Sequence, residues 1–168
     1  MATKILTLCH ANRSRSLLLE ATIRKAAVEA GKDVEVYSAG VNDPQATRYG
    51  WEPPQGQVDF CNRFGVDLAN HVSKRVTRED VEGADLVLVS DREAVEMVQG
   101  EYGGNGKVHT IKEYIAGKNL PQLEADLDEP WFPRNGETYR GIEQKTDHAD
   151  YVQLNEMIRF GKAIVGRV

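Results

Sequence analysis

A short segment near the start of the chain, Cys9 to Ser16, combines a thiol with arginines and small polar side chains, between an apolar run and a helix-like stretch. A loop that leads from a strand into a helix can turn several backbone N–H groups inward, and the helix adds partial positive charge at its first turn. Such a loop binds anions, and its positive potential favours the thiolate of Cys9, which is the nucleophilic form. Arg15 can offer two parallel N–H donors to phosphate oxygens. The segment therefore predicts a phosphate-binding loop that carries a nucleophile.

Regular elements on both sides must position this loop. The run from Ile5 to Leu8 is apolar or β-branched, as expected of a buried strand, and apolar residues recur at helical spacing from Ser16 until Gly31 can end the helix. Capping patterns at Thr77 and Ser90 indicate two more helix starts. Apolar runs predict further strands at residues 34–37 (closing at the turn Ser38–Gly40), 84–89 and 108–111, and helices are expected at about 57–64 and 151–165.

Alternating strands and helices predict an α/β fold, namely a three-layer, doubly wound arrangement in which a four-stranded parallel sheet carries helices on both faces. The ligand of such a sheet binds at the carboxyl ends of the strands, where Cys9 falls. A chain of 168 residues suits a single domain spanning 1–168. The stretch from 42 to 56 is rich in proline, glycine and aromatic residues and is expected to form a surface loop.

The composition limits the classes of partner that the protein is expected to bind. The formal net charge of -5 argues against nucleic acid, because a nucleic-acid partner requires a basic surface. No secretion segment or membrane-length apolar run is visible, so we expect a cytoplasmic protein without a membrane partner, and a monomer or weak homo-oligomer. The two cysteines, Cys9 and Cys61, are too far apart for a paired-cysteine metal site, and we expect Cys61 to be a buried apolar residue.

Several segments occur in the order typical of one family. They are Cys9 with Arg15 and Ser16 after five intervening residues, Tyr37–Gly40, Gly65–Leu68 followed by His71, Ala84–Val89, and Asp128–Trp131. Together they resemble the low-molecular-weight protein tyrosine phosphatases over roughly the first three quarters of the chain. The resemblance implies that family's fold and a phosphomonoester hydrolase, a protein-tyrosine phosphatase that acts on phosphotyrosine in a phosphorylated protein or on a small aryl phosphate.

The resemblance also implies residue roles, with no metal and no organic cofactor. Cys9 attacks phosphorus to form a cysteinyl phosphate, Arg15 stabilises the equatorial oxygens, and Ser16 donates to the sulfur. Asp128 serves as general acid, although Glu129 takes the family position when Pro130 is the reference. The substrate-binding residues are His10, Ala11, Asn12, Arg13, Ser14 and Trp131, with His10 turned outward, and the loop-supporting residues are Asn12, Ser38 and His71.

Three features depart from the family pattern. Ala11 replaces the usual glycine, Ser14 replaces a frequent second cysteine, and Arg13 adds a positive charge within the loop. Two other functions stay open. One is arsenate reduction through external thiols or Cys61, and the other is a non-catalytic phosphate-binding regulatory module whose acid loop has drifted. A phosphocarrier is a weaker alternative, because Arg15 and a downstream acid suit hydrolysis better.

Overall fold

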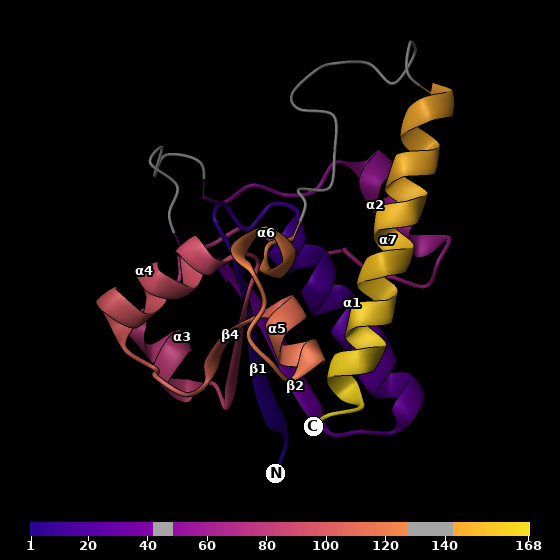
Figure 1. The fold of residues 1–168 in the computed structure, drawn as a ribbon. Coiled ribbons are helices and arrows are strands. Elements are labelled where there is room, and N and C mark those ends of the chain that lie inside the picture. The colour runs from indigo at the N-terminus through magenta and orange to yellow at the C-terminus, as the bar shows by residue number, and fades with distance from the viewer. Residues whose placement is uncertain (42–48, 128–142) are drawn as a thin grey trace.

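A four-stranded, fully parallel sheet forms the centre of the computed structural model, which describes residues 1–41, 49–127 and 143–168 (Figure 1). The strand order is β2-β1-β3-β4, so the strand that leads to Cys9 lies inside the sheet. This arrangement confirms the predicted α/β fold. The strands are β1 (Thr3–Cys9), β2 (Val34–Gly40), β3 (Leu86–Val89) and β4 (Val108–Thr110).

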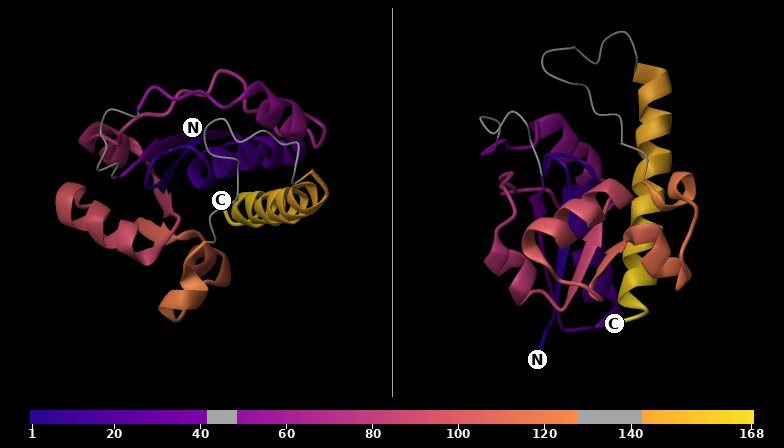
Figure 2. Two further views of the ribbon diagram at one scale, coloured as in Figure 1. Left: turned by 90° about the horizontal axis from the view of Figure 1, so that it is seen from above. Right: turned by 60° about the vertical axis from the view of Figure 1, so that its left-hand side comes forward.

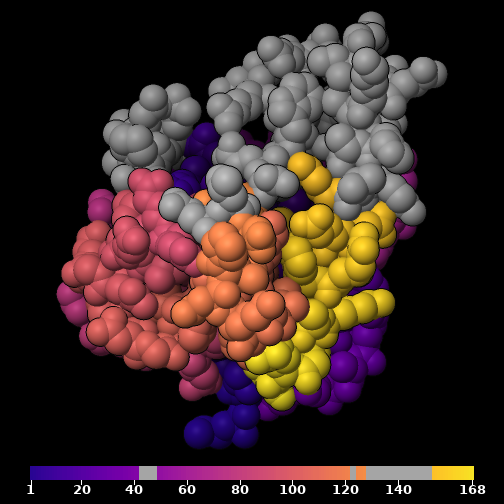
Figure 3. Space-filling view, viewed as in Figure 1, coloured from indigo at the N-terminus to yellow at the C-terminus, as the bar shows by residue number. Residues whose placement is uncertain are grey.

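Helices cover both faces of this sheet. Figure 1 shows α3 and α4 on one side of the strands and α1 and α7 on the other, and both views of Figure 2 keep α7 beside α1. In the space-filling view, α5 and α6 fill the surface between α4 and α7 (Figure 3). The helices are α1 (Arg15–Ala30), α2 (Gln55–Asn62), α3 (Arg78–Gly83), α4 (Arg92–Tyr102), α5 (Ile111–Ala116), α6 (Gln122–Ala125) and α7 (Glu143–Val165).

Alternation along the central strands divides the core in two. Ile5 and Leu88 belong to the cluster that includes residues of α1 and α7, whereas Leu6 and Val87 belong to the cluster that includes residues of α3 and α4. Successive side chains of a strand point to opposite faces, and all four of these are fully buried. Burial on both faces accounts for the continuous apolar runs in the strands, because parallel sheets with helical crossovers have no solvent-facing side.

The N-cap of α3 agrees with the sequence prediction, and the N-cap of α4 differs from it by one residue. Thr77 begins α3 with the expected capping box, in which its side chain and that of Asp80 bond each other's backbone N–H. The N-cap of α4, however, is Asp91 and not Ser90: its carboxylate accepts from the Ala94 N–H at 2.8 Å. Ser90 instead donates its hydroxyl to Asp91 Oδ2 at 2.7 Å. A carboxylate is the stronger acceptor at this terminus, so it displaces the hydroxyl.

Other boundaries also differ from the predicted ones. Strand β4 ends at Thr110, one residue early, because the Thr110 hydroxyl caps α5 through the Glu113 N–H. Helix α7 begins at residue 143, earlier than the expected 151, and α2 begins at 55. The short helices α5 and α6 were not anticipated. Among the described residues, no helix is long and apolar enough to cross a membrane.

Gly161 sets the approach of α7 to α1. A Cβ at this position would lie 2.6 Å from the Thr22 carbonyl oxygen, a backbone atom that cannot rotate away. We therefore expect Gly161→Ala to lower the free energy of unfolding by about 1–3 kcal/mol, measured by urea denaturation. Gly100→Ala in α4 is the matched control, because nothing lies within 4 Å of its Cβ position, and it should be neutral or stabilising. Equal changes in both variants would contradict this packing account.

Candidate active site

Cys9 ends the inner strand β1 and its side chain is buried, with 2% of the residue exposed. Its Sγ lies 3.0 Å from Ser16 Oγ, at the start of α1. Asn12 Nδ2 donates to the same Ser16 Oγ at 2.9 Å, which leaves the serine hydrogen available to the sulfur. The arrangement suits a serine that donates to a thiolate, since a hydrogen bond to the charged form stabilises it.

Asn12 holds the loop in shape. It is fully buried and adopts a left-handed conformation with φ 56, which asparagine tolerates better than most residues. Its amide nitrogen also donates to Ser38 Oγ at 2.9 Å, and its Oδ1 accepts from the Lys74 N–H at 3.0 Å. His71 Nε2 donates to the Asn12 carbonyl at 3.0 Å. The structure thus brings together the three residues expected to support the loop.

The network continues from Ser38 to α1. The Ser38 hydroxyl accepts from Asn12 and donates to Glu20, a residue that no sequence pattern marked as part of the site. Beside it, Gly40 lies opposite Cys9 in the β1–β2 pairing. A Cβ on Gly40 would lie 2.7 Å from the His10 carbonyl oxygen. The Ser38–Gly40 segment therefore supports the loop in two ways: the Ser38 hydroxyl bonds to Asn12, and Gly40 leaves room for the loop backbone because it has no side chain.

Arg15 is held by a residue that sequence reasoning treated only as part of a helix cap. Its Nη1 donates to Asp91 Oδ2 at 3.3 Å and to the Leu127 carbonyl at 3.5 Å. The side chains of Arg15 and Asp91 are each only 10% exposed, so this ion pair is screened little by solvent. Asp91 follows β3, the neighbour of β1, at the carboxyl edge where the ligand was expected. That placement was the available signal for a role in the site.

His10 contacts the same carboxylate rather than turning outward. Its Nε2 lies 3.0 Å from Asp91 Oδ2, and its side chain is 33% exposed. Burial alone would raise the pKa of Asp91, but hydrogen bonds from His10, the Ala94 N–H and Ser90 hold that pKa well below its usual range. The hydrogen bond to Asp91 in turn raises the pKa of His10, against the opposing effect of burial. Asp91 is therefore an ionised centre shared by two residues of the loop.

The remaining loop residues are half-buried. The Arg13 guanidinium stacks over the Trp51 ring, 5.8 Å from its centroid. Ser14 is the N-cap of α1 through its carbonyl, which accepts from the Leu18 N–H, and its side chain makes no capping bond. Ala11 is half-buried. Trp51, whose place beside the loop the sequence did not reveal, contributes an aromatic surface there.

The candidate acid lies elsewhere in the chain. Asp128, Glu129 and Trp131 fall outside the described residues, so their placement stays a prediction. Leu127, the last described residue before them, has its N–H bonded to the Ser90 carbonyl at 2.8 Å, and its carbonyl accepts from Arg15. The chain therefore enters the 128–142 segment from beside the phosphate-binding loop.

The fold and this site define a phosphatase-like hydrolase of the α/β class. The chain belongs to a family described as "Low molecular weight phosphotyrosine protein phosphatase", whose model matches residues 4–158. Membership confirms the predicted family and implies a phosphorylated protein as substrate.

Individual relatives agree with this assignment. The protein-arginine-phosphatase of Bacillus subtilis (strain 168) is 34% identical over 121 residues, which cover 71% of this chain and 77% of the relative. The low molecular weight protein-tyrosine-phosphatase YfkJ of the same organism is 23% identical over 141 residues, covering 79% and 83%. In three dimensions, the low molecular weight protein tyrosine phosphatase from T. tengcongensis superposes with a TM-score of 0.76 at 23% identity, covering 99% of this chain and 100% of that chain.

The Asp91–Arg15 pair provides a test of the site. We expect Asp91→Asn to lower kcat by about 10- to 100-fold, because a charged hydrogen bond that orients the guanidinium is lost. Asparagine is as good an N-cap as aspartate, so α4 should persist in circular dichroism. Asp85→Asn is the control: Asp85 accepts from the Lys4 N–H, near the amino end of the sheet. A kcat unchanged in Asp91→Asn would show that Asp91 does not position Arg15.

Proposed function

We propose that this protein hydrolyses phosphotyrosine in proteins through a cysteinyl phosphate formed on Cys9. The observation that carries the proposal is the buried Cys9 sulfur, hydrogen-bonded to Ser16 on the same loop that presents Arg15. This set supplies a nucleophile, a donor to the sulfur and a guanidinium for the phosphoryl oxygens. Small aryl phosphates should be accepted as well, since the reaction requires only the phosphoryl group and its leaving phenol.

The chemistry proceeds in two steps. In the first, the Cys9 thiolate attacks phosphorus, the bond to the phenolic oxygen breaks, and the acid on the 128–131 segment protonates that oxygen. Arg15 and the loop N–H groups stabilise the equatorial oxygens. In the second step, the same acid, now a carboxylate, takes a proton from water as the water attacks phosphorus. Ser16 donates to the departing Cys9 thiolate, and free phosphate is released.

Arg13 supports phosphotyrosine over phosphoarginine as the substrate. A relative is named for each activity, so the choice depends on this chain's own residues. The Arg13 guanidinium of the phosphate-binding loop lies over the Trp51 ring, and we expect the group attached to phosphorus to lie beside this pair. A phenyl ring can pack against this pair, whereas a second guanidinium meets like charge.

The experiment compares kcat/KM on one peptide sequence that carries either phosphotyrosine or phosphoarginine. We expect phosphotyrosine to be preferred by at least about tenfold, which corresponds to about 1.4 kcal/mol of discrimination. Arg13→Ala should reduce that preference. A tenfold preference for phosphoarginine in the unaltered protein would overturn the substrate assignment without affecting the role of Cys9.

Arsenate reduction gains no support from Cys61. This residue, the second of two cysteines in the chain, is 1% exposed and packs in the core cluster beside α1. A disulfide relay within the chain requires a second thiol that can reach Cys9. Cys61 lies on α2 in a different environment from the end of β1, as expected of a buried apolar residue.

Substitution of each carboxylate identifies the general acid. We expect Asp128→Asn to lower kcat on phenyl phosphate by about 100-fold or more, and Glu129→Gln to lower it less, because proton donation contributes about 10²–10⁴ to such reactions. On para-nitrophenyl phosphate both losses should shrink, since nitrophenolate leaves without protonation. A larger loss in Glu129→Gln would assign the role to Glu129. Small and equal losses of kcat in the two variants would favour the alternative of a phosphate-binding regulatory module that lacks a general acid.

A further inference from the structure

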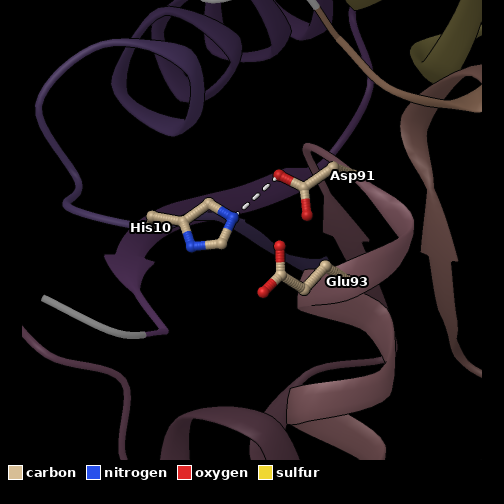
Figure 4. Close-up of side chains that lie close together, drawn as sticks. All are labelled: His10, Asp91 and Glu93. Atoms are coloured by element: carbon tan, nitrogen blue, oxygen red, sulfur yellow. Dashed lines mark hydrogen bonds and ion pairs between the residues drawn. The ribbon is translucent and has the colours of Figure 1, made fainter. Parts of the chain in front are cut away.

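Three side chains with metal-binding donors converge beside the phosphate-binding loop. His10 reaches from the loop after β1, while Asp91 and Glu93 come from the start of α4 (Figure 4). One ligand atom from each residue lies within 4.8 Å of the others. We propose that these three residues form a binding site for a divalent transition-metal ion of the Zn²⁺ class, and that the bound ion inhibits the phosphatase.

The donor set suits Zn²⁺ in number and kind. One imidazole nitrogen and two carboxylate oxygens are a combination that Zn²⁺ accepts at about 2.0–2.2 Å, with a fourth position open to water or a phosphate oxygen. Mg²⁺ and Ca²⁺ prefer all-oxygen sites, so the imidazole favours a transition metal. Glu93 is solvent-exposed, and rotation of its side chain can shorten the separations to those of a coordinated ion.

The surroundings orient one ligand in advance and favour a cation. Ser90 Oγ donates to Asp91 Oδ2 at 2.7 Å and the Ala94 N–H donates to Oδ1 at 2.8 Å, so both oxygens of the carboxylate are held in position before an ion arrives. Two carboxylates and one imidazole face the cluster, with the Arg15 guanidinium beside Asp91. The cluster therefore attracts a cation even though it borders an anion-binding loop.

Occupancy of this site acts on the reaction through Asp91. The same oxygen, Oδ2, accepts from Arg15 Nη1 at 3.3 Å and from His10 Nε2 at 3.0 Å. An ion bound to Asp91 and His10 replaces their mutual hydrogen bond and competes with Arg15 for the carboxylate. Arg15 then loses its contact with Asp91 and keeps its bond to the Leu127 carbonyl, so its guanidinium is less well oriented toward the phosphoryl oxygens. The ion is thus an inhibitor rather than a cofactor.

The first test measures Zn²⁺ binding by titration calorimetry in a Cys9→Ser background. This substitution removes the Cys9 thiolate as a competing Zn²⁺ ligand. Adding Glu93→Gln should weaken Zn²⁺ binding by about tenfold or more, because one ligand charge is lost. Adding Glu96→Gln, the same charge change on an exposed residue of α4, should leave it unchanged. Adding His10→Ala should weaken binding at least as much as Glu93→Gln. Equal Zn²⁺ affinity in the Glu93 and Glu96 variants, or no binding to Cys9→Ser, would overturn the site.

The second test measures inhibition and rests on the proposed function. Without metal, Glu93→Gln should match the unaltered protein, and its half-inhibitory Zn²⁺ concentration should rise about tenfold. An unchanged value would overturn the inhibitory role and point to the Cys9 thiolate as the Zn²⁺ ligand. If the protein hydrolyses no phosphoester at all, the proposed function fails, whereas the calorimetric result still decides the metal site.

Discussion

Cys9→Ser should lower turnover of para-nitrophenyl phosphate by at least about 10⁴-fold while inorganic phosphate still binds. Serine at this position lacks the ionised sulfur on which the first step depends, and loss of a nucleophile is among the largest single effects in catalysis. The loop N–H groups and Arg15, which bind the phosphoryl oxygens, are unchanged by the substitution. Steady-state kinetics and calorimetric titration with phosphate measure the two properties separately.

Cys61→Ser is the matched control for this variant. Cys61 is buried in α2, so this variant makes the same replacement of sulfur by oxygen in the core, away from the phosphate-binding loop. It should lower stability modestly and leave kcat near that of the unaltered protein. Turnover that survives in Cys9→Ser, or that disappears equally in both variants, would contradict a specific role for Cys9.

Arg15→Lys should lower kcat by about 10²–10³-fold or more. A lysine keeps the charge but loses the planar pair of donors that matches two phosphoryl oxygens. It also loses the geometry by which Arg15 reaches Asp91 and the Leu127 carbonyl. Removal of one preorganised donor to developing charge has an effect of this size in other enzymes.

The same substitution at an arginine outside the loop network provides the control. Arg78 lies on α3 with a side chain 57% exposed and pairs with Glu82 one turn away, so Arg78→Lys should leave kcat unchanged. A lysine at position 15 that supports more than about a tenth of the original kcat would show that charge alone is sufficient. Bidentate recognition by Arg15 would then be excluded.

From residue patterns alone, the parts of the site that could be predicted are those whose determinants are local in sequence, whereas the distant Ser38 and His71 could be predicted only from the family resemblance. Cys9, Asn12, Arg15 and Ser16 lie within one strand–loop–helix unit, and the alternation of apolar runs and helical patterns gives the sheet around it. The fold class follows from the same alternation, because parallel strands require helical crossovers.

Asp91 was not predicted as a site residue because its role depends on strand order. It contacts Arg15 across 76 positions of sequence, and only the β1–β3 pairing brings the two strand ends together. From the sequence alone, Asp91 is indistinguishable from an ordinary residue of a helix start. Trp51 was missed for a similar reason, since its contact with Arg13 joins the loop to a segment without regular periodicity. Short helices such as α6 carry too few residues for an apolar pattern to show.

The most direct test of the central claim is a single-turnover, acid-quenched reaction with a phosphotyrosine peptide labelled in its phosphoryl group. Peptide mapping of the quenched protein locates any label that is covalently attached. We expect transient label on the peptide that contains Cys9, lost as free phosphate appears, whereas Cys9→Ser should carry no label that is lost with release of free phosphate. Two results would contradict the cysteinyl-phosphate mechanism while the substrate peptide is hydrolysed. One is label on another residue of the protein, such as His10, and the other is no phosphoenzyme at any time point.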